Sequence, residues 1–169
     1  HRGMKQVDWR PEWNVLDIGC GGGANVKRLL KLCPQGKVYG MDLSEESVAF
    51  ARRHNAGELD RRCFIQQGDV CSLPYGDGAF DAVTAFETVY FWSSVSKALA
   101  EVFRVIRKGG CFLISLEASD PELGKAWTER IKGMTVYGAE ELKQLLSQAG
   151  FSDIRVIQKK EELHIVAHK

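Results

Sequence analysis

The residues that most clearly suggest chemistry are the glycines of the segment VLDIGCGGG, residues 15–23. An apolar, strand-like run enters this segment and a helical pattern leaves it. Gly19 and Gly21 permit a tight turn, and small residues let a ligand approach the backbone. The N-terminus of the following helix would present free N–H groups and a partial positive charge. This arrangement suits a carboxylate or a phosphate equally.

A second chemical group, the carboxylate of Asp42, ends the next strand-like run, 23 residues after Gly19. A carboxylate at this place can accept hydrogen bonds from ribose hydroxyls. Gly19, Gly21 and Ala24 also match the dinucleotide fingerprint G-x-G-x-x-[GA]. These features predict a nucleoside site, and they leave NAD and S-adenosylmethionine open as its ligand.

Three features favour S-adenosylmethionine. Asp17 lies two positions before Gly19, where it can meet the cofactor's ammonium and would repel a pyrophosphate. In QGDV, residues 67–70, Asp69 can accept from the adenine amino group and the backbone of Val70 can donate to a ring nitrogen. The alternative for Asp69 is a turn carboxylate that caps local backbone N–H groups. The third feature is a strand pair at the end of the chain.

That pair belongs to an alternation of strand-like and helical segments that predicts an α/β fold. Residues 151–158 and 163–168 both resemble strands, and the short connection between them allows only an antiparallel hairpin. A standard dinucleotide-binding sheet is all parallel instead. The other predicted strands are 13–18, 37–42, 62–67, 80–86 and 110–117, and helices are predicted for 24–32, after Ser44, for 93–107 up to Gly109-Gly110, and for 139–149. Residues 118–138 lack either period at several points.

Composition excludes several classes of protein. A length of 169 residues suits one domain, residues 1–169, and 23 basic against 22 acidic residues give no field for nucleic acid or anionic membranes. No apolar run approaches the roughly 20 residues of a membrane span. The five cysteines are scattered without a CxxC pair, which predicts reduced thiols in a cytoplasmic protein. No cluster has metal-ligand spacing, so no metal is expected, and His54, His164 and His168 are predicted to be surface residues.

Five motifs in order complete the pattern: DIGCGGG (17–23), MDLS (41–44), GDV (68–70), FDAVTAFE (80–87) and VFRVIRKGG (102–110). Together they resemble the class I S-adenosylmethionine-dependent methyltransferases, and most closely the small-molecule branch called methyltransferase type 11. The resemblance runs from Trp13 to Lys169. It implies a Rossmann-like fold, a seven-stranded mostly parallel sheet of order 3-2-1-4-5-7-6 with an antiparallel last strand and helices on both faces.

The resemblance also implies site residues and a reaction, with S-adenosylmethionine as cofactor and S-adenosylhomocysteine as product. Gly19, Cys20 and Gly21 would line the methionine portion near Asp17, and Asp42 would hold the ribose. The remaining expected contacts are Met41 and Leu43 beside the adenine, Asp69 and Val70 at its edge, and Phe86 and Glu87 beside the sulfonium. Relatives usually carry a longer N-terminal helical cap that contributes to acceptor specificity. Only twelve residues precede the first predicted strand here, so this cap is expected to be missing or short.

Methyl transfer is an in-line displacement, which depends on holding the acceptor against the methyl group and excluding water. A base is required only if the acceptor must lose a proton, and Glu87 and Tyr90 in ETVYFW (87–92) are the candidates. Trp92 lies in the same segment, and aromatics there are more often packing residues. In the family, the region 118–138, with Trp127, Met134 and Tyr137, covers the substrate; an ordinary surface loop is the alternative.

The fourth strand does not end in the N/D-P-P-Y type turn of amide and adenine N-methylators, and no Pro-Cys pair supplies the nucleophile of cytosine C5-methylators. The expected partner is therefore a small-molecule or exposed side-chain acceptor, with no nucleic acid and no membrane. The sequence does not determine the oligomeric state. Two other functions remain open: an NAD-dependent oxidoreductase of related fold, and an S-adenosylmethionine-binding module without catalysis.

Overall fold

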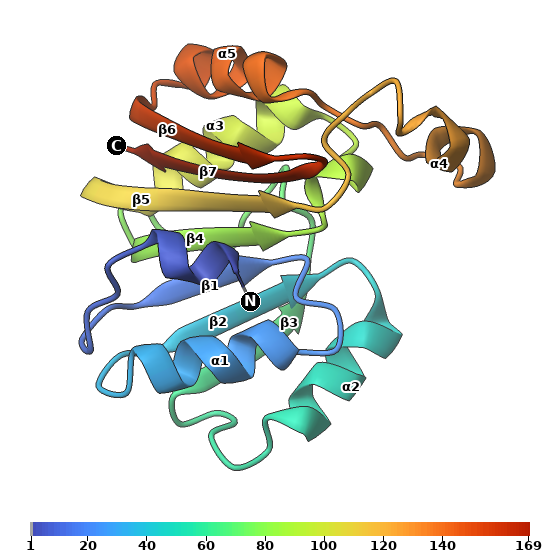
Figure 1. Cartoon of the computed structure of the whole chain (residues 1–169). Coiled ribbons are helices and arrows are strands. Elements are labelled where there is room, and N and C mark those ends of the chain that lie inside the picture. Colours follow the sequence, from blue (N-terminus) through green and yellow to red (C-terminus); the bar gives the residue numbers. More distant parts are fainter. Residues whose placement is uncertain (1) are drawn as a thin grey trace.

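The computed structural model describes residues 2–169 as one seven-stranded sheet with helices on both faces (Figure 1). The strands are β1 Val15–Ile18, β2 Val38–Asp42, β3 Cys63–Gln67, β4 Phe80–Phe86, β5 Ile106–Leu116, β6 Ser152–Lys159 and β7 Glu162–His168. The α-helices are α1 Ala24–Leu32, α2 Glu45–His54, α3 Val95–Val105, α4 Lys125–Arg130 and α5 Ala139–Ala149, with 3-10 turns η1 Gly3–Gln6 and η2 Val89–Phe91.

The sheet order is β3-β2-β1-β4-β5-β7-β6, as the sequence predicted. Strands β1 to β5 pair in parallel, and β7 runs antiparallel to both of its neighbours, β5 and β6. Ile165 of β7 lies opposite Ile114 of β5 and Val156 of β6. The predicted hairpin is confirmed, and its insertion makes the apolar strand β5 an interior strand rather than an exposed edge.

Each face of the sheet has its own core. Helices α1 and α2 and the turn η1 pack on one face, where Val26, Leu29 and Ala51 are buried. Helices α3 and α5 pack on the other face, where Leu99 and Leu142 are buried. Because both faces are covered, strands such as β1 and β4 are apolar along almost their whole length, as parallel strands in α/β proteins usually are.

The N-terminus of α2 follows directly from the sequence at the end of β2. Ser44 is the N-cap residue, and its hydroxyl accepts a hydrogen bond from the backbone N–H of Ser47 at 3.2 Å. Glu45 and Glu46 occupy the first turn and Arg52, Arg53 and His54 the last, which matches the helix dipole at both ends. The cap therefore fixes where α2 starts relative to Asp42.

Three expectations were wrong in detail. The helix predicted for 93–107 ends at Val105, because Ile106 turns into β5 and pairs with Phe80; the apolar period simply continued across the junction. The region 118–138, predicted to be irregular, contains the short helix α4. His164 is buried instead of exposed, since β7 lies inside the sheet, and its ring lies 2.9 Å from the Ser115 hydroxyl and 3.2 Å from the Glu162 carboxylate.

Within residues 2–169, no helix combines the length and the hydropathy needed to cross a bilayer.

The inserted strand β7 yields a stability prediction. Ile165 is completely buried at the centre of β7, whereas Ile157 on the edge strand β6 is partly exposed. Ile165→Ala should lower the free energy of unfolding by about 2–5 kcal/mol, because it leaves a cavity in the core. Ile157→Ala should cost less than half as much in the same urea titration. Equal losses for the two variants would contradict the interior position of β7.

Candidate functional site

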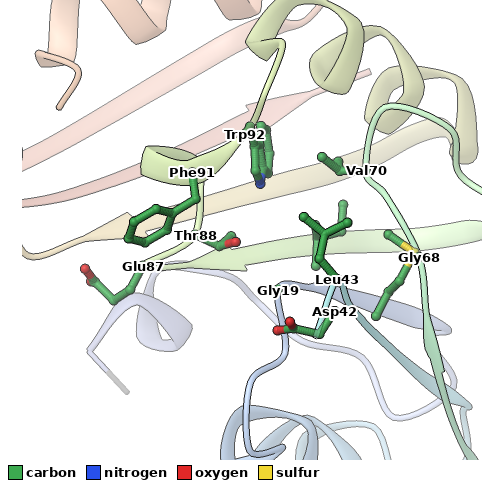
Figure 2. A pocket seen from close by; sticks show the side chains of 11 residues that line it. Gly19, Asp42, Leu43, Gly68, Val70, Glu87, Thr88, Phe91 and Trp92 are labelled. Carbon is green, nitrogen blue, oxygen red and sulfur yellow. The ribbon is translucent and has the colours of Figure 1, made fainter. Parts of the chain in front are cut away.

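A cavity of about 340 Å³ lies at the carboxyl ends of β1, β2 and β4, where the strand order reverses. This is the usual place for a ligand in an open α/β sheet. Figure 2 shows Glu87, Thr88 and Phe91 at one end of the cavity, Gly68 and Val70 at the other, and Gly19, Asp42 and Leu43 between them. Among residues 2–169, the cavity is lined by Ile18, Gly19, Met41, Asp42, Leu43, Gly68, Val70, Glu87, Thr88, Phe91 and Trp92.

The glycine-rich connection from β1 to α1 borders the cavity through Gly19, whereas its other residues, the predicted Gly21 included, lie outside the lining. Gly19, Gly21 and Gly23 all adopt left-handed backbone, with φ of 68°, 50° and 80°. A Cβ on Gly19 would lie only 2.1 Å from the Thr88 hydroxyl, so a larger residue would push the chain after β4 away. The backbone N–H groups of Gly19 and Cys20 both donate to the Met41 carbonyl, which attaches the connection to the end of β2.

Asp42 is joined to this connection by its side chain. Its Oδ2 accepts a hydrogen bond from the backbone N–H of Gly21 at 2.9 Å, and its Oδ1 accepts one from Ser44 at 3.0 Å. Each carboxylate oxygen can accept more than one hydrogen bond, so both remain able to bind a hydroxyl in the cavity. The backbone thus orients the carboxylate that the sequence singled out.

Asp17 lies behind the cavity, inside the sheet, and does not line it. Its Oδ1 accepts a hydrogen bond from the Thr84 hydroxyl at 2.6 Å, and only 2% of the residue is exposed. Burial raises the pKa of Asp17 to about 7, with the Thr84 hydrogen bond acting against this and the charge of Asp42 adding to it. A cationic group bound nearby would favour the ionised form.

Glu87 occupies the end of β4 and takes left-handed backbone, with φ of 55°. Its Oε2 accepts a hydrogen bond from the Tyr90 hydroxyl at 2.9 Å, while its buried Oε1 has no hydrogen-bond partner within residues 2–169. Burial raises the pKa of Glu87, and hydrogen bonds from the Glu117 backbone and from Tyr90 lower it. Tyr90 itself is buried and does not line the cavity, so it acts on Glu87 rather than on a ligand.

The other predicted residues divide into two groups. Met41, Leu43 and Val70 line the cavity, whereas Cys20 and Phe86 are buried behind it. Asp69 lies outside the lining, and its Oδ1 accepts a hydrogen bond from the backbone N–H of Cys71 at 2.8 Å, which is the local capping contact considered as its alternative role. The lining residues absent from the predicted site are Ile18, Gly68, Thr88, Phe91 and Trp92.

The missed aromatics follow from the turn after β4. In η2 the consecutive side chains of Val89 and Tyr90 turn into the core, which leaves Phe91 half exposed at the cavity. Glu87 and Thr88 precede them at the same strand end. The segment ETVYFW contains these aromatic residues, but its sequence alone does not show which of them face the core and which face the cavity. The 3-10 turn decides this, because it sets the direction of each side chain.

The charges of the cavity favour a cation. Within residues 2–169, its lining contains the carboxylates of Asp42 and Glu87 and no lysine, arginine or histidine. Asp17 adds a third acidic group behind the glycine-rich connection. A pyrophosphate would enter this cavity against repulsion and without a cationic partner, whereas a positively charged ligand would be attracted.

The chain is similar to known methyltransferases. A family model described as "Methyltransferase domain" matches residues 16–114. A demethylmenaquinone methyltransferase of Symbiobacterium thermophilum is 36% identical over 120 residues, which covers 70% of this chain and 47% of that protein. A ubiquinone/menaquinone biosynthesis C-methyltransferase of Dinoroseobacter shibae is 35% identical over 136 residues, covering 75% and 54%. The chain therefore spans about half the length of these curated relatives.

The solved structures agree in fold. The crystal structure of a SAM-dependent methyltransferase from Aquifex aeolicus superposes with a TM-score of 0.81 at 26% identity. That match covers 98% of this chain and 87% of the other. The similarity thus extends over the whole sheet, including the terminal hairpin.

The buried carboxyl group of Asp17 predicts a pH dependence. Its folded pKa of about 7 lies above the ordinary value of 3.8, so the folded protein binds this proton more tightly than the unfolded chain does. The resulting stabilisation is complete below pH 3.8 and is lost as the pH rises through 7, by at most about 4 kcal/mol. Asp17→Asn keeps an oxygen for Thr84 and removes the titration.

Thermal unfolding of both proteins from pH 4 to pH 8 checks this prediction. The melting temperature of Asp17→Asn should exceed that of the wild type at pH 8, and the difference should shrink toward pH 4. A difference that does not change with pH would show that the Asp17 carboxyl group does not titrate in this range.

Proposed function

Because the chain belongs to the family of S-adenosylmethionine-dependent methyltransferases, we propose that it transfers the methyl group of S-adenosylmethionine to a small-molecule acceptor. The observation that supports this most directly is the cavity at the strand ends, where the described lining residues include two carboxylates and no cationic side chain. S-adenosylmethionine, when bound, supplies an activated methyl group on a sulfonium cation. Its size is suited to a cavity within the usual range of about 300–1,000 Å³ for small-molecule sites.

The glycine-rich connection and two carboxylates would hold the polar parts of the cofactor. The N-terminus of α1, with Gly23 as N-cap residue, attracts a carboxylate through its backbone N–H groups. Asp17 would favour the neighbouring ammonium, directly or through water. Asp42, oriented by Gly21, would accept hydrogen bonds from the ribose hydroxyls.

The adenine would lie toward the end of the cavity formed by Gly68 and Val70. Met41 and Leu43 line this part, and Leu43 is largely exposed in the unliganded chain, so a flat ring can cover it. The backbone of Val70 and the carboxylate of Asp69 are the predicted contacts for the edge of the ring. The Asp69–Cys71 hydrogen bond engages one carboxylate oxygen, so the adenine contact would use the other.

The acceptor would approach the opposite end, beside Glu87 and Phe91. Oε1 of Glu87 is a buried acceptor atom without a partner among the described residues, which suits it to receive a proton or a hydrogen bond from a hydroxyl or amine nucleophile. Tyr90 would hold the other oxygen in place, as the 2.9 Å hydrogen bond indicates. Phe91 and Trp92 would pack against the apolar part of the acceptor and exclude water.

Residues 118–138 would cover the acceptor. Both ends of this segment are attached to Tyr90: its hydroxyl accepts a hydrogen bond from the backbone N–H of Ala118, and its carbonyl accepts one from Thr135. Helix α4 projects away from the rest of the chain (Figure 1) and buries no side chain. Trp127 on this helix is half exposed and lies outside the cavity lining.

A thermal-shift experiment tests the proposed cofactor. S-adenosylhomocysteine should raise the melting temperature and NAD should not; ligand at about 100 times its dissociation constant adds about 2.7 kcal/mol. A shift with NAD alone would overturn the proposal. A turnover assay with a panel of candidate acceptors then separates the enzyme from a module that binds the cofactor without catalysis.

Calorimetry with S-adenosylhomocysteine ranks the two polar contacts. Asp42→Ala should weaken binding by about 1.5–3 kcal/mol, because hydrogen bonds to a charged group are lost. Asp69→Ala should weaken it less, and Asp69→Asn least, since an amide oxygen still accepts. Unchanged affinity for Asp42→Ala removes that residue from the site, and equal affinities for both Asp69 variants and the wild type assign Asp69 to local capping.

A further inference from the structure

Helix α2 lies against the far end of the glycine-rich connection, through side chains that the cavity does not contain. Phe50 covers Gly22, where an added Cβ would lie 3.1 Å from its ring. Ala51 and Asn55 contact Gly23, where an added Cβ would lie 2.9 Å from the Ala51 Cβ and 2.6 Å from the Asn55 amide nitrogen. Gly23 therefore must be glycine both for its left-handed backbone and for the approach of α2.

Asn55 is the polar group in this contact, and it is 5% exposed. Its Nδ2 donates one hydrogen bond to the Gly23 carbonyl at 3.1 Å and another to the Ala51 carbonyl at 3.0 Å. Gly23 also accepts from the backbone N–H of Lys27 in the first turn of α1. One side-chain amide thus joins the last turn of α2 to the N-cap of α1.

The orientation of this amide follows from its neighbours. Both groups that face it are carbonyl oxygens, so the NH₂ side must point toward them. The Oδ1 atom is buried without a hydrogen-bond partner within residues 2–169. A buried oxygen without a hydrogen-bond partner is unfavourable and uncommon. Asn55 keeps such an oxygen while its NH₂ group donates to two carbonyls, which indicates that these two hydrogen bonds have a specific role.

Within residues 2–169, two side-chain hydrogen bonds connect the glycine-rich segment to the region of β2 and α2, and Asn55 makes the second of them. The first is the hydrogen bond from Gly21 to Asp42, directly before α2 begins. The second comes at the other end of the helix, from Asn55 to Gly23. Since α2 is a rigid spacer between Asp42 and Asn55, the two connections together fix where Gly21, Gly22 and Gly23 lie relative to the Asp42 carboxylate.

We propose that Asn55 is a positioning residue for the cofactor: it holds Gly23 so that the glycine-rich connection is ordered before the ligand binds. The inference rests on the proposed function, because it assigns this connection to the methionine portion of S-adenosylmethionine. Glycines lose more conformational freedom on ordering than other residues, so a segment that is already ordered binds its ligand more tightly.

The test uses two Asn55 variants and one matched control. Asn55→Asp keeps the shape and removes both donors, and Asn55→Ala removes the whole amide. The control is Asn14→Ala: the Asn14 side-chain amide also hydrogen-bonds to the backbone, here through its oxygen, which accepts from the N–H of Lys37, but it does so at the opposite end of β1. Binding is measured well below the melting temperature of each variant.

The dissociation constant for S-adenosylhomocysteine should rise about 3- to 10-fold in both Asn55 variants, which corresponds to one or two lost neutral hydrogen bonds. Asn14→Ala should bind as the wild type does, even if its melting temperature falls. Normal binding by Asn55→Asp with weak binding by Asn55→Ala would assign the effect to packing and overturn the proposal. Lower melting temperatures with unchanged binding in both would overturn it too.

Amide hydrogen exchange without ligand gives a second readout that does not depend on the cofactor. Exchange at Gly21–Gly23 should be faster in both Asn55 variants than in the wild type and in Asn14→Ala. Unchanged exchange there refutes the positioning role. If the wild type fails to bind S-adenosylhomocysteine, the proposed function fails, while the exchange experiment still decides whether Asn55 orders the connection.

Discussion

The connection from β1 to α1 has five residues, and the arrangement of the whole site depends on how they turn. Three of them adopt left-handed backbone, which only glycine enters at little cost. Their position is set from two sides: Met41 and Asp42 accept hydrogen bonds from the start of the turn, and Thr88 packs where a Cβ of Gly19 would be. The ends of β1, β2 and β4 are thereby brought around one cavity.

Negative charge is concentrated around this turn more than the nearly neutral chain would suggest. Asp17 lies inside the sheet, Asp42 at the end of β2 and Glu87 at the end of β4, and none of the described residues that line the cavity between them is cationic. Burial of these two carboxyl groups raises the pKa of both Asp17 and Glu87. A ligand that carries a sulfonium and an ammonium reduces the electrostatic repulsion between these carboxylates, because it places positive charges beside them.

One end of the cavity is organised around the end of β4. Glu87 is attached to the neighbouring strand through its backbone N–H, which donates to the Ser115 carbonyl, and to Tyr90 through its side chain. Tyr90 in turn holds both ends of the segment that carries α4. One residue, Tyr90, thus connects that segment to the Glu87 carboxylate.

The sequence by itself determined the order of the elements and singled out several residues that line the cavity, among them Gly19, Asp42 and Val70. Glycine spacing, the carboxylate at the end of β2 and the short connection between the last two strands each depend on local backbone geometry, which the residue types dictate. Only the tertiary structure decided where side chains from different strands meet. It buried His164 by inserting β7 beside β5, turned Phe91 rather than Tyr90 toward the cavity, and brought Asn55 to Gly23, 32 residues earlier in the chain. These contacts depend on how helices pack across a twisted sheet, and no pattern within a short segment of sequence records that packing.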